Sequence, residues 1–135
     1  MPNGNVQAVR FIAFILVAAA IYYAGISNEV YAVASPASIT FHTVIRKVES
    51  VAAFVVVAAT AAWWLGASRR LTAILIYGTA AYSGLIELGQ RIEGSHESLA
   101  ESAFDVLCGA LGGYIVAAFV VFATRFSSRA DRKRR

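Results

Sequence analysis

Five side chains that could bind a ligand or transfer a proton lie near the ends of strongly apolar segments. They are an amine, a guanidinium, an amide and two carboxylates: Lys47, Arg91, Gln90, Glu87 and Asp105. Cations of this kind stabilise anions, and a carboxylate can act as a general acid or base. Gln90 and Arg91 follow Glu87 at helical spacing, so the three share one helix face and a Glu87–Arg91 pair is possible.

Asp105 can be interpreted in two ways. It stands at the predicted start of a helix, where the unpaired amides and the helix dipole favour an anion. One interpretation is that it caps or begins this helix. The other is that it belongs to the same polar cluster as the side chains at the end of the preceding helix.

The sequence supports a metal site or a catalytic site less well than a binding site. Cys108 is the only cysteine, and His42 and His96 are far from it in sequence, so we predict no metal and no cofactor. Neither a serine-nucleophile motif nor a phosphate-binding glycine loop accompanies the carboxylates. The sequence therefore favours a binding or structural role. The alternative is a membrane-embedded enzyme acting on a lipid-linked or phosphate-bearing substrate.

The elements that carry these side chains follow from the composition. Hydrophobic residues make up 59% of the 135 residues and charged residues only 15%, which is more apolar than a soluble domain requires. Long segments with few charges predict four membrane-spanning helices, over about residues 9–26, 48–66, 71–88 and 103–124. We expect an all-α, four-helix transmembrane bundle that forms a single domain over residues 1–135.

The first apolar segment could instead be a signal peptide, because Ala32-Val33-Ala34 resembles a cleavage site. The region before the segment carries only Arg10 as a charge, and this site lies too far beyond the apolar residues. We therefore interpret residues 9–26 as a membrane span.

The distribution of lysine and arginine predicts the orientation. Three cations, Arg46, Lys47 and Arg91, lie on one side, whereas Arg10, Arg69, Arg70 and the six of the tail over residues 125–135 lie on the other. By the positive-inside rule, both termini of this multi-pass protein face the cytoplasm and the loops over 27–45 and 89–102 face outward. We expect the basic tail to bind anionic lipids of the cell membrane rather than nucleic acid.

Small residues predict where helices approach each other. Gly109 and Gly113 form a small-xxx-small pair, beside Gly112, and the preceding helix offers Ala80 and Gly84 at the same spacing. Packing between the last two helices of one chain is the favoured use of these residues. A homo-oligomer is the alternative.

Residues 46–116 resemble the VanZ-like membrane proteins, which are named for an accessory protein of glycopeptide resistance. Lys47 lies in a segment that looks like the family's Asp-Lys-x-x-His motif, with Arg46 and Ser50 in place of its Asp and His. Arg69-Arg70 looks like the family's basic turn, and Glu87-Leu88-Gly89-Gln90 like its Glu-x-x-Gln.

The segment from Asp105 to Gly113 resembles the family's Asp-x-x-x-Asn-x-x-Gly, with Gly109 in place of the Asn and Gly112 as the matching glycine. In an alternative register, Glu101 takes the place of the family's Asp. The resemblance implies an envelope protein linked to glycopeptide tolerance, whose outward cluster binds a cell-wall precursor or a glycopeptide.

A small drug–proton transporter is a further alternative, since four helices in a short chain suit such proteins. A transporter of this kind needs a carboxylate deep in a span. Glu87 lies near the end of its predicted span instead, which favours the binding role.

Overall fold

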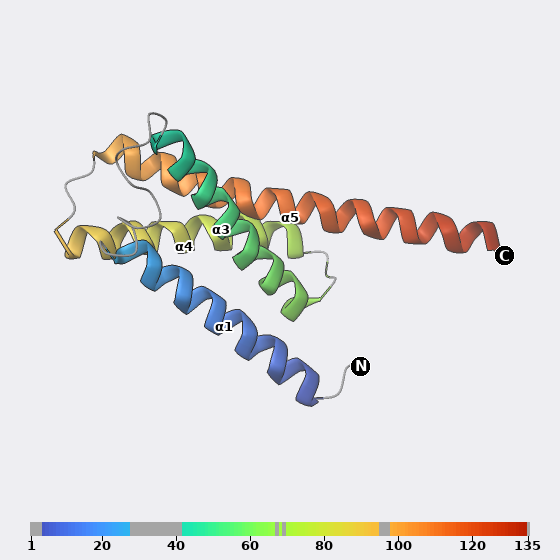
Figure 1. Cartoon of the computed structure of the whole chain (residues 1–135). Helices are drawn as coiled ribbons and strands as arrows, with labels where there is room; N and C mark the ends of the chain where they lie inside the picture. Colours follow the sequence, from blue (N-terminus) through green and yellow to red (C-terminus); the bar gives the residue numbers. More distant parts are fainter. Residues whose placement is uncertain (1–3, 28–41, 67, 69, 95–97, 135) are drawn as a thin grey trace.

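The protein is a bundle of four α-helices, seen in a computed structural model that describes residues 4–27, 42–66, 68, 70–94 and 98–134 (Figure 1). These residues include no strand, and each helix is long and apolar enough to cross a membrane. The fold class expected from the sequence is therefore confirmed. The helices are α1 (Gly4–Ile26), α3 (His42–Leu65), α4 (Leu71–Ile92) and α5 (Leu99–Arg134).

Several sequence expectations fall outside this description. Most of the predicted loop over 27–45, with the candidate cleavage site Ala32-Val33-Ala34, lies outside the described residues, as do Arg69 and His96.

The helices run further than the predicted spans. The first turns of α3 include Arg46 and Lys47, and the last turn of α4 includes Arg91, which the apolar segments did not contain. A helix can continue into the headgroup region, whereas an apolar segment marks only the part that matches the hydrocarbon thickness. The charged candidates are therefore held on helices and not on loops.

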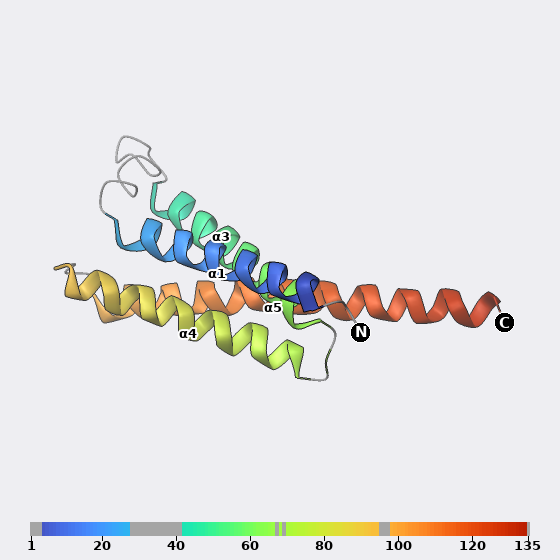
Figure 2. The ribbon, with the colours of Figure 1, turned by 90° about the horizontal axis from the view of Figure 1, so that it is seen from below.

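α4 and α5 form the most extensive contact of the bundle, and α3 packs on both of them. α1 contacts α3 and α4 but, among the described helices, does not reach α5 (Figures 1 and 2). The apolar core between α3, α4 and α5 consists of Ala58, Leu71, Leu75, Val116 and Ala117.

Glycines of α5 allow the backbones of α4 and α5 to approach closely. A Cβ atom added to Gly109 would lie 2.7 Å from the carbonyl oxygen of Thr79 and 2.7 Å from the Cβ atom of Ser83. A Cβ atom on Gly113 would clash with the carbonyl oxygen of Leu75. The lack of a side chain at Gly109 and Gly113 therefore allows the α5 backbone to lie directly against α4.

The other small residues singled out from the sequence have different positions. A Cβ atom on Gly112 would lie 2.6 Å from that of Phe54, so Gly112 packs against α3. Gly84 has room for a side chain, since its nearest neighbour, Val106, would be 3.9 Å away, and Ala80 is half-buried. The α4 side of the close contact is formed by Thr79 and Ser83 instead.

α1 is attached at the edge of the bundle and has no buried residue. Polar side chains of its neighbours hold it: the Tyr82 hydroxyl donates to the carbonyl oxygen of Ala18, and the Gln90 amide donates to that of Gly25 at 2.8 Å. At its other end, Gln7 donates to the carbonyl oxygen of Trp64 at 2.8 Å.

The described N-terminal turns of α1, the end of α3 and the start of α4 lie at one end of the bundle, and α5 runs past this end (Figures 1 and 2). With 36 residues, α5 is about 54 Å long, well beyond the roughly 30 Å of hydrocarbon in a bilayer. The basic tail predicted over 125–135 therefore continues the same helix as far as Arg134.

Candidate functional site

The described end of the bundle opposite the start of α1 holds an ion pair between two helices. The Lys47 ammonium of α3 lies 2.6 Å from both carboxylate oxygens of Asp105 on α5. The Lys47 side chain is 22% exposed and the Asp105 side chain 13%, so the pair is largely buried. Two of the five candidates from the sequence, Lys47 and Asp105, are therefore paired between α3 and α5.

Neighbouring groups fix the ion pair in place. The Lys47 ammonium lies 5.5 Å from the centre of the Phe104 ring, a distance at which the ring face attracts a cation. The buried Ser83 hydroxyl of α4 donates to the backbone carbonyl oxygen of Asp105 at 2.8 Å. Residues of α3, α4 and α5 thus meet at a single level of the bundle.

Asp105 does not cap α5, contrary to one of the two interpretations from the sequence. The helix begins at Leu99, and Ser98 caps it: the Ser98 hydroxyl accepts from the amide of Glu101 at 3.3 Å. The Glu101 carboxylate accepts from the Ser98 amide at 2.9 Å, which completes a capping box. Asp105 therefore lies inside the helix, where its carboxylate can face α3.

The three candidates at the end of α4 contact different neighbours. Glu87 is buried, at 8% exposure. The Gln90 amide is directed to α1, where it donates to Gly25. Arg91 is exposed and donates to the Ser102 hydroxyl of α5 at 3.1 Å. Gln90 therefore joins α4 to α1, and Arg91 joins α4 to α5.

Thr79 and Ser83, which the sequence analysis overlooked, form a polar stripe with Glu87 on the buried face of α4. The three residues are spaced four apart, and all are less than 9% exposed. Thr79 donates to the carbonyl oxygen of Leu75 in its own helix at 2.6 Å. The spacing of polar residues in an apolar segment was a signal for this stripe, because polar groups in a span face the bundle interior.

The chemistry of the site is charge pairing and hydrogen bonding. Within the described part of the chain, no three His, Cys, Asp or Glu side chains gather as a metal site would need. Cys108 is buried as a free thiol one helical turn from Asp105. Among the described residues at this end, the exposed charged groups include the guanidinium of Arg91 and the carboxylates of Glu49, Glu93 and Glu101.

The fold and the site together define a class: a membrane protein of four helices with its ionisable side chains concentrated near the helix ends. No family model, curated protein or solved structure matches the chain.

Proposed function

We propose that the chain is a VanZ-like, multi-pass protein of the cytoplasmic membrane that binds an envelope component at its outward end. The observation that carries the proposal is the meeting of Lys47, Asp105 and Arg91 at one end of the bundle. The division of nine cations against three along the sequence favours a cytoplasmic location for the opposite end, where Arg10 and Arg70 lie.

The ion pair and the exposed guanidinium have separate roles in this proposal. Asp105 neutralises Lys47 and holds α3 against α5, so the pair positions the helices that carry the site. Arg91 lies at the surface, and a guanidinium carries five N–H donors in a planar fork. It can therefore bind a phosphate or carboxylate of a lipid-linked wall precursor or a glycopeptide while it donates to Ser102.

Binding to the full chain in lipid nanodiscs tests this function. The probes are a fluorescent glycopeptide and a lipid-linked disaccharide-pentapeptide precursor. Arg91→Gln should weaken the binding of at least one probe by about tenfold, which corresponds to the loss of one charged hydrogen bond. Arg132→Gln removes the same charge from the tail and should leave probe binding unchanged. Equal binding by wild type and Arg91→Gln contradicts the proposal.

Substitution of the buried Glu87 in cells distinguishes a binding role of the cluster from a purely structural one. If the cluster binds a ligand, Glu87→Gln should reduce glycopeptide tolerance while the amount of membrane-inserted protein stays constant. If tolerance and inserted protein fall together, the cluster only holds the helices in place. Inserted protein is measured by immunoblotting of alkali-washed membranes.

A further inference from the structure

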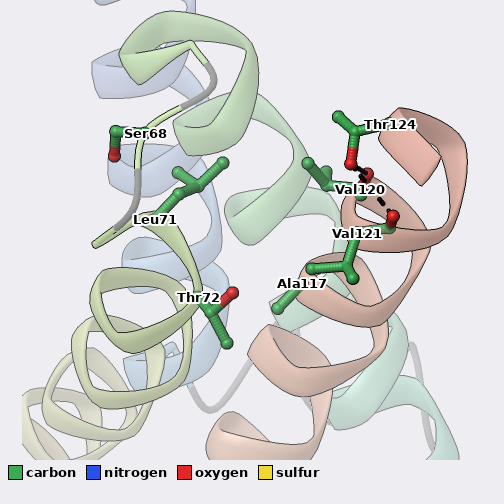
Figure 3. A pocket seen from close by; sticks show the side chains of 7 residues that line it. All are labelled: Ser68, Leu71, Thr72, Ala117, Val120, Val121 and Thr124. Carbon is green, nitrogen blue, oxygen red and sulfur yellow. Dashed lines mark hydrogen bonds between the residues drawn. The ribbon is translucent and has the colours of Figure 1, made fainter. Parts of the chain in front are cut away.

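A groove of about 330 Å³, open along one side, lies between the start of α4 and the last apolar turns of α5. It is far from the polar cluster, so the proposed function makes no use of it. Its volume falls at the lower end of the roughly 300–1,000 Å³ that ligand pockets occupy. Figure 3 shows the side chains that line it: Ser68, Leu71, Thr72, Ala117, Val120, Val121 and Thr124.

The lining combines three hydroxyl groups with apolar side chains. Ser68, which precedes α4, and Thr124 lie at one end, which we call the polar end (Figure 3). Thr72 adds a hydroxyl group on the α4 side, opposite the apolar α5 wall of Ala117 and Val121. Thr124 donates its proton within α5, to the carbonyl oxygens of Val120 and Val121, so its hydroxyl oxygen can only accept a further bond. A polar end and an apolar body suit an amphiphile.

Cations stand beside the polar end of the groove. Arg70 directly precedes Leu71, and Arg125 follows Val121 by four residues, so it continues the same face of α5 by one turn. Both side chains are exposed. No charged residue lies between Asp105 and Arg125, so Arg125 is the first cation after the uncharged stretch of α5, as expected of a residue near lipid phosphates.

We propose that the groove binds one acyl chain of an anionic glycerophospholipid, whose phosphate lies between Arg70 and Arg125. The attraction of an anionic headgroup to cations at the membrane surface supplies the selectivity, and the apolar wall supplies contact with the chain. The bound lipid then fills the space between α4 and α5 at the end where the two helices diverge from their glycine contact.

A second copy of the chain fits this surface less well than a lipid. A two-fold contact places the same patch of each subunit against the other. Arg70 and Arg125 of both copies would then lie together, and four cations would repel one another. An anionic headgroup has the complementary charge.

Native mass spectrometry of the full chain, released from detergent with added lipid, tests the site. Dioleoylphosphatidylglycerol should bind at least tenfold more tightly than dioleoylphosphatidylcholine, and millimolar inorganic phosphate should not displace it. Thr72→Trp, which fills the groove from an exposed position, and the double variant Arg70→Gln/Arg125→Gln should each weaken phosphatidylglycerol binding by roughly tenfold.

Matched variants serve as controls. Phe119→Trp adds bulk at a position of α5 that is 69% exposed and does not line the groove. Arg132→Gln/Arg134→Gln removes two cations from the tail. Both should retain binding within about twofold of wild type. Far-UV circular dichroism and gel filtration establish whether each variant is folded. If Thr72→Trp does not fold, the lipid affinity of Arg70→Gln/Arg125→Gln decides the test.

Three results would overturn the proposal. The first is equal affinity for the two lipids, and the second is an equal loss of affinity in the tail variant, which would indicate diffuse attraction to the tail. The third is a dimer in the absence of lipid that Thr72→Trp dissociates, since a second copy would then occupy the groove.

Discussion

The Lys47–Asp105 pair shows what a charged residue requires inside a membrane bundle. Removing either charge from water is costly, and attraction to a close partner offsets that cost only when the geometry is good. Here the ammonium reaches both carboxylate oxygens at 2.6 Å and also faces the Phe104 ring.

Removing one member of this pair should destabilise the protein more than removing both. Lys47→Met leaves the Asp105 carboxylate without its cation, and we expect a loss of roughly 2 kcal/mol. Breaking a fully buried pair costs about 3–5 kcal/mol, and we expect less here because both side chains retain some exposure. Lys47→Met/Asp105→Leu should recover at least half of the loss. Unfolding by SDS titration in mixed micelles measures both, and a double variant less stable than the single one contradicts this account.

At the scale of elements, the contact between α4 and α5 depends on the pairing of glycines with hydroxyl residues. Lipid tails are as apolar as the side chains, so helices in a bilayer associate through close van der Waals contact and hydrogen bonds. Gly109 brings the α5 backbone onto Thr79 and Ser83, and the Ser83 hydroxyl then reaches the carbonyl oxygen of Asp105. The close approach and the polar cluster are thus parts of a single arrangement.

Gly109→Leu should separate α4 from α5, because even a Cβ atom meets the Thr79 backbone at 2.7 Å and backbone cannot move aside. We expect a loss of about 3 kcal/mol in mixed micelles, at the upper end of overpacking costs. Gly78→Leu is the matched control, since nothing lies within 4 Å of a Cβ atom there, and its stability should stay near wild type. Equal stability of the two variants would show that the contact is dispensable.

Among the residues that the structure describes, the charged side chains lie toward two ends of the bundle. One end carries the Lys47–Asp105 pair, and the other carries Arg10 beside Trp63, with its guanidinium 5.3 Å from the ring centre. α5 continues beyond this second end as a basic helix. An arginine over an interfacial tryptophan and a basic extension suit the cytoplasmic headgroup region, which supports the proposed orientation.

Cysteine labelling in intact cells tests the orientation of the whole protein. In a Cys108→Ala background, Glu93→Cys should react with a membrane-impermeant maleimide, because its position is exposed beyond the end of α4. Ser127→Cys should react only after the cells are permeabilised. The reverse pattern would invert the topology and place the polar cluster in the cytoplasm.

The amino-acid sequence by itself determined the number and kind of the elements. Four apolar segments of spanning length can satisfy their backbone hydrogen bonds in lipid only as helices, so composition and length were sufficient. The clustering of charges near helix ends followed from the same property, since a charge interrupts an apolar segment. Helix ends were less predictable: the Ser98–Glu101 capping box starts α5 before its apolar segment begins.

Only the tertiary structure decided which side chains meet. The sequence allowed Asp105 to cap its helix, whereas in the structure Asp105 binds Lys47 of α3. The contact of Arg91 with Ser102 of α5 was not foreseen either. The sequence also allowed Ala80 and Gly84 to form the α4 contact that Thr79 and Ser83 provide. Helical periodicity places a residue on a face, but the rotation of each helix against its neighbours depends on contacts between residues far apart in the sequence, and no local pattern records them.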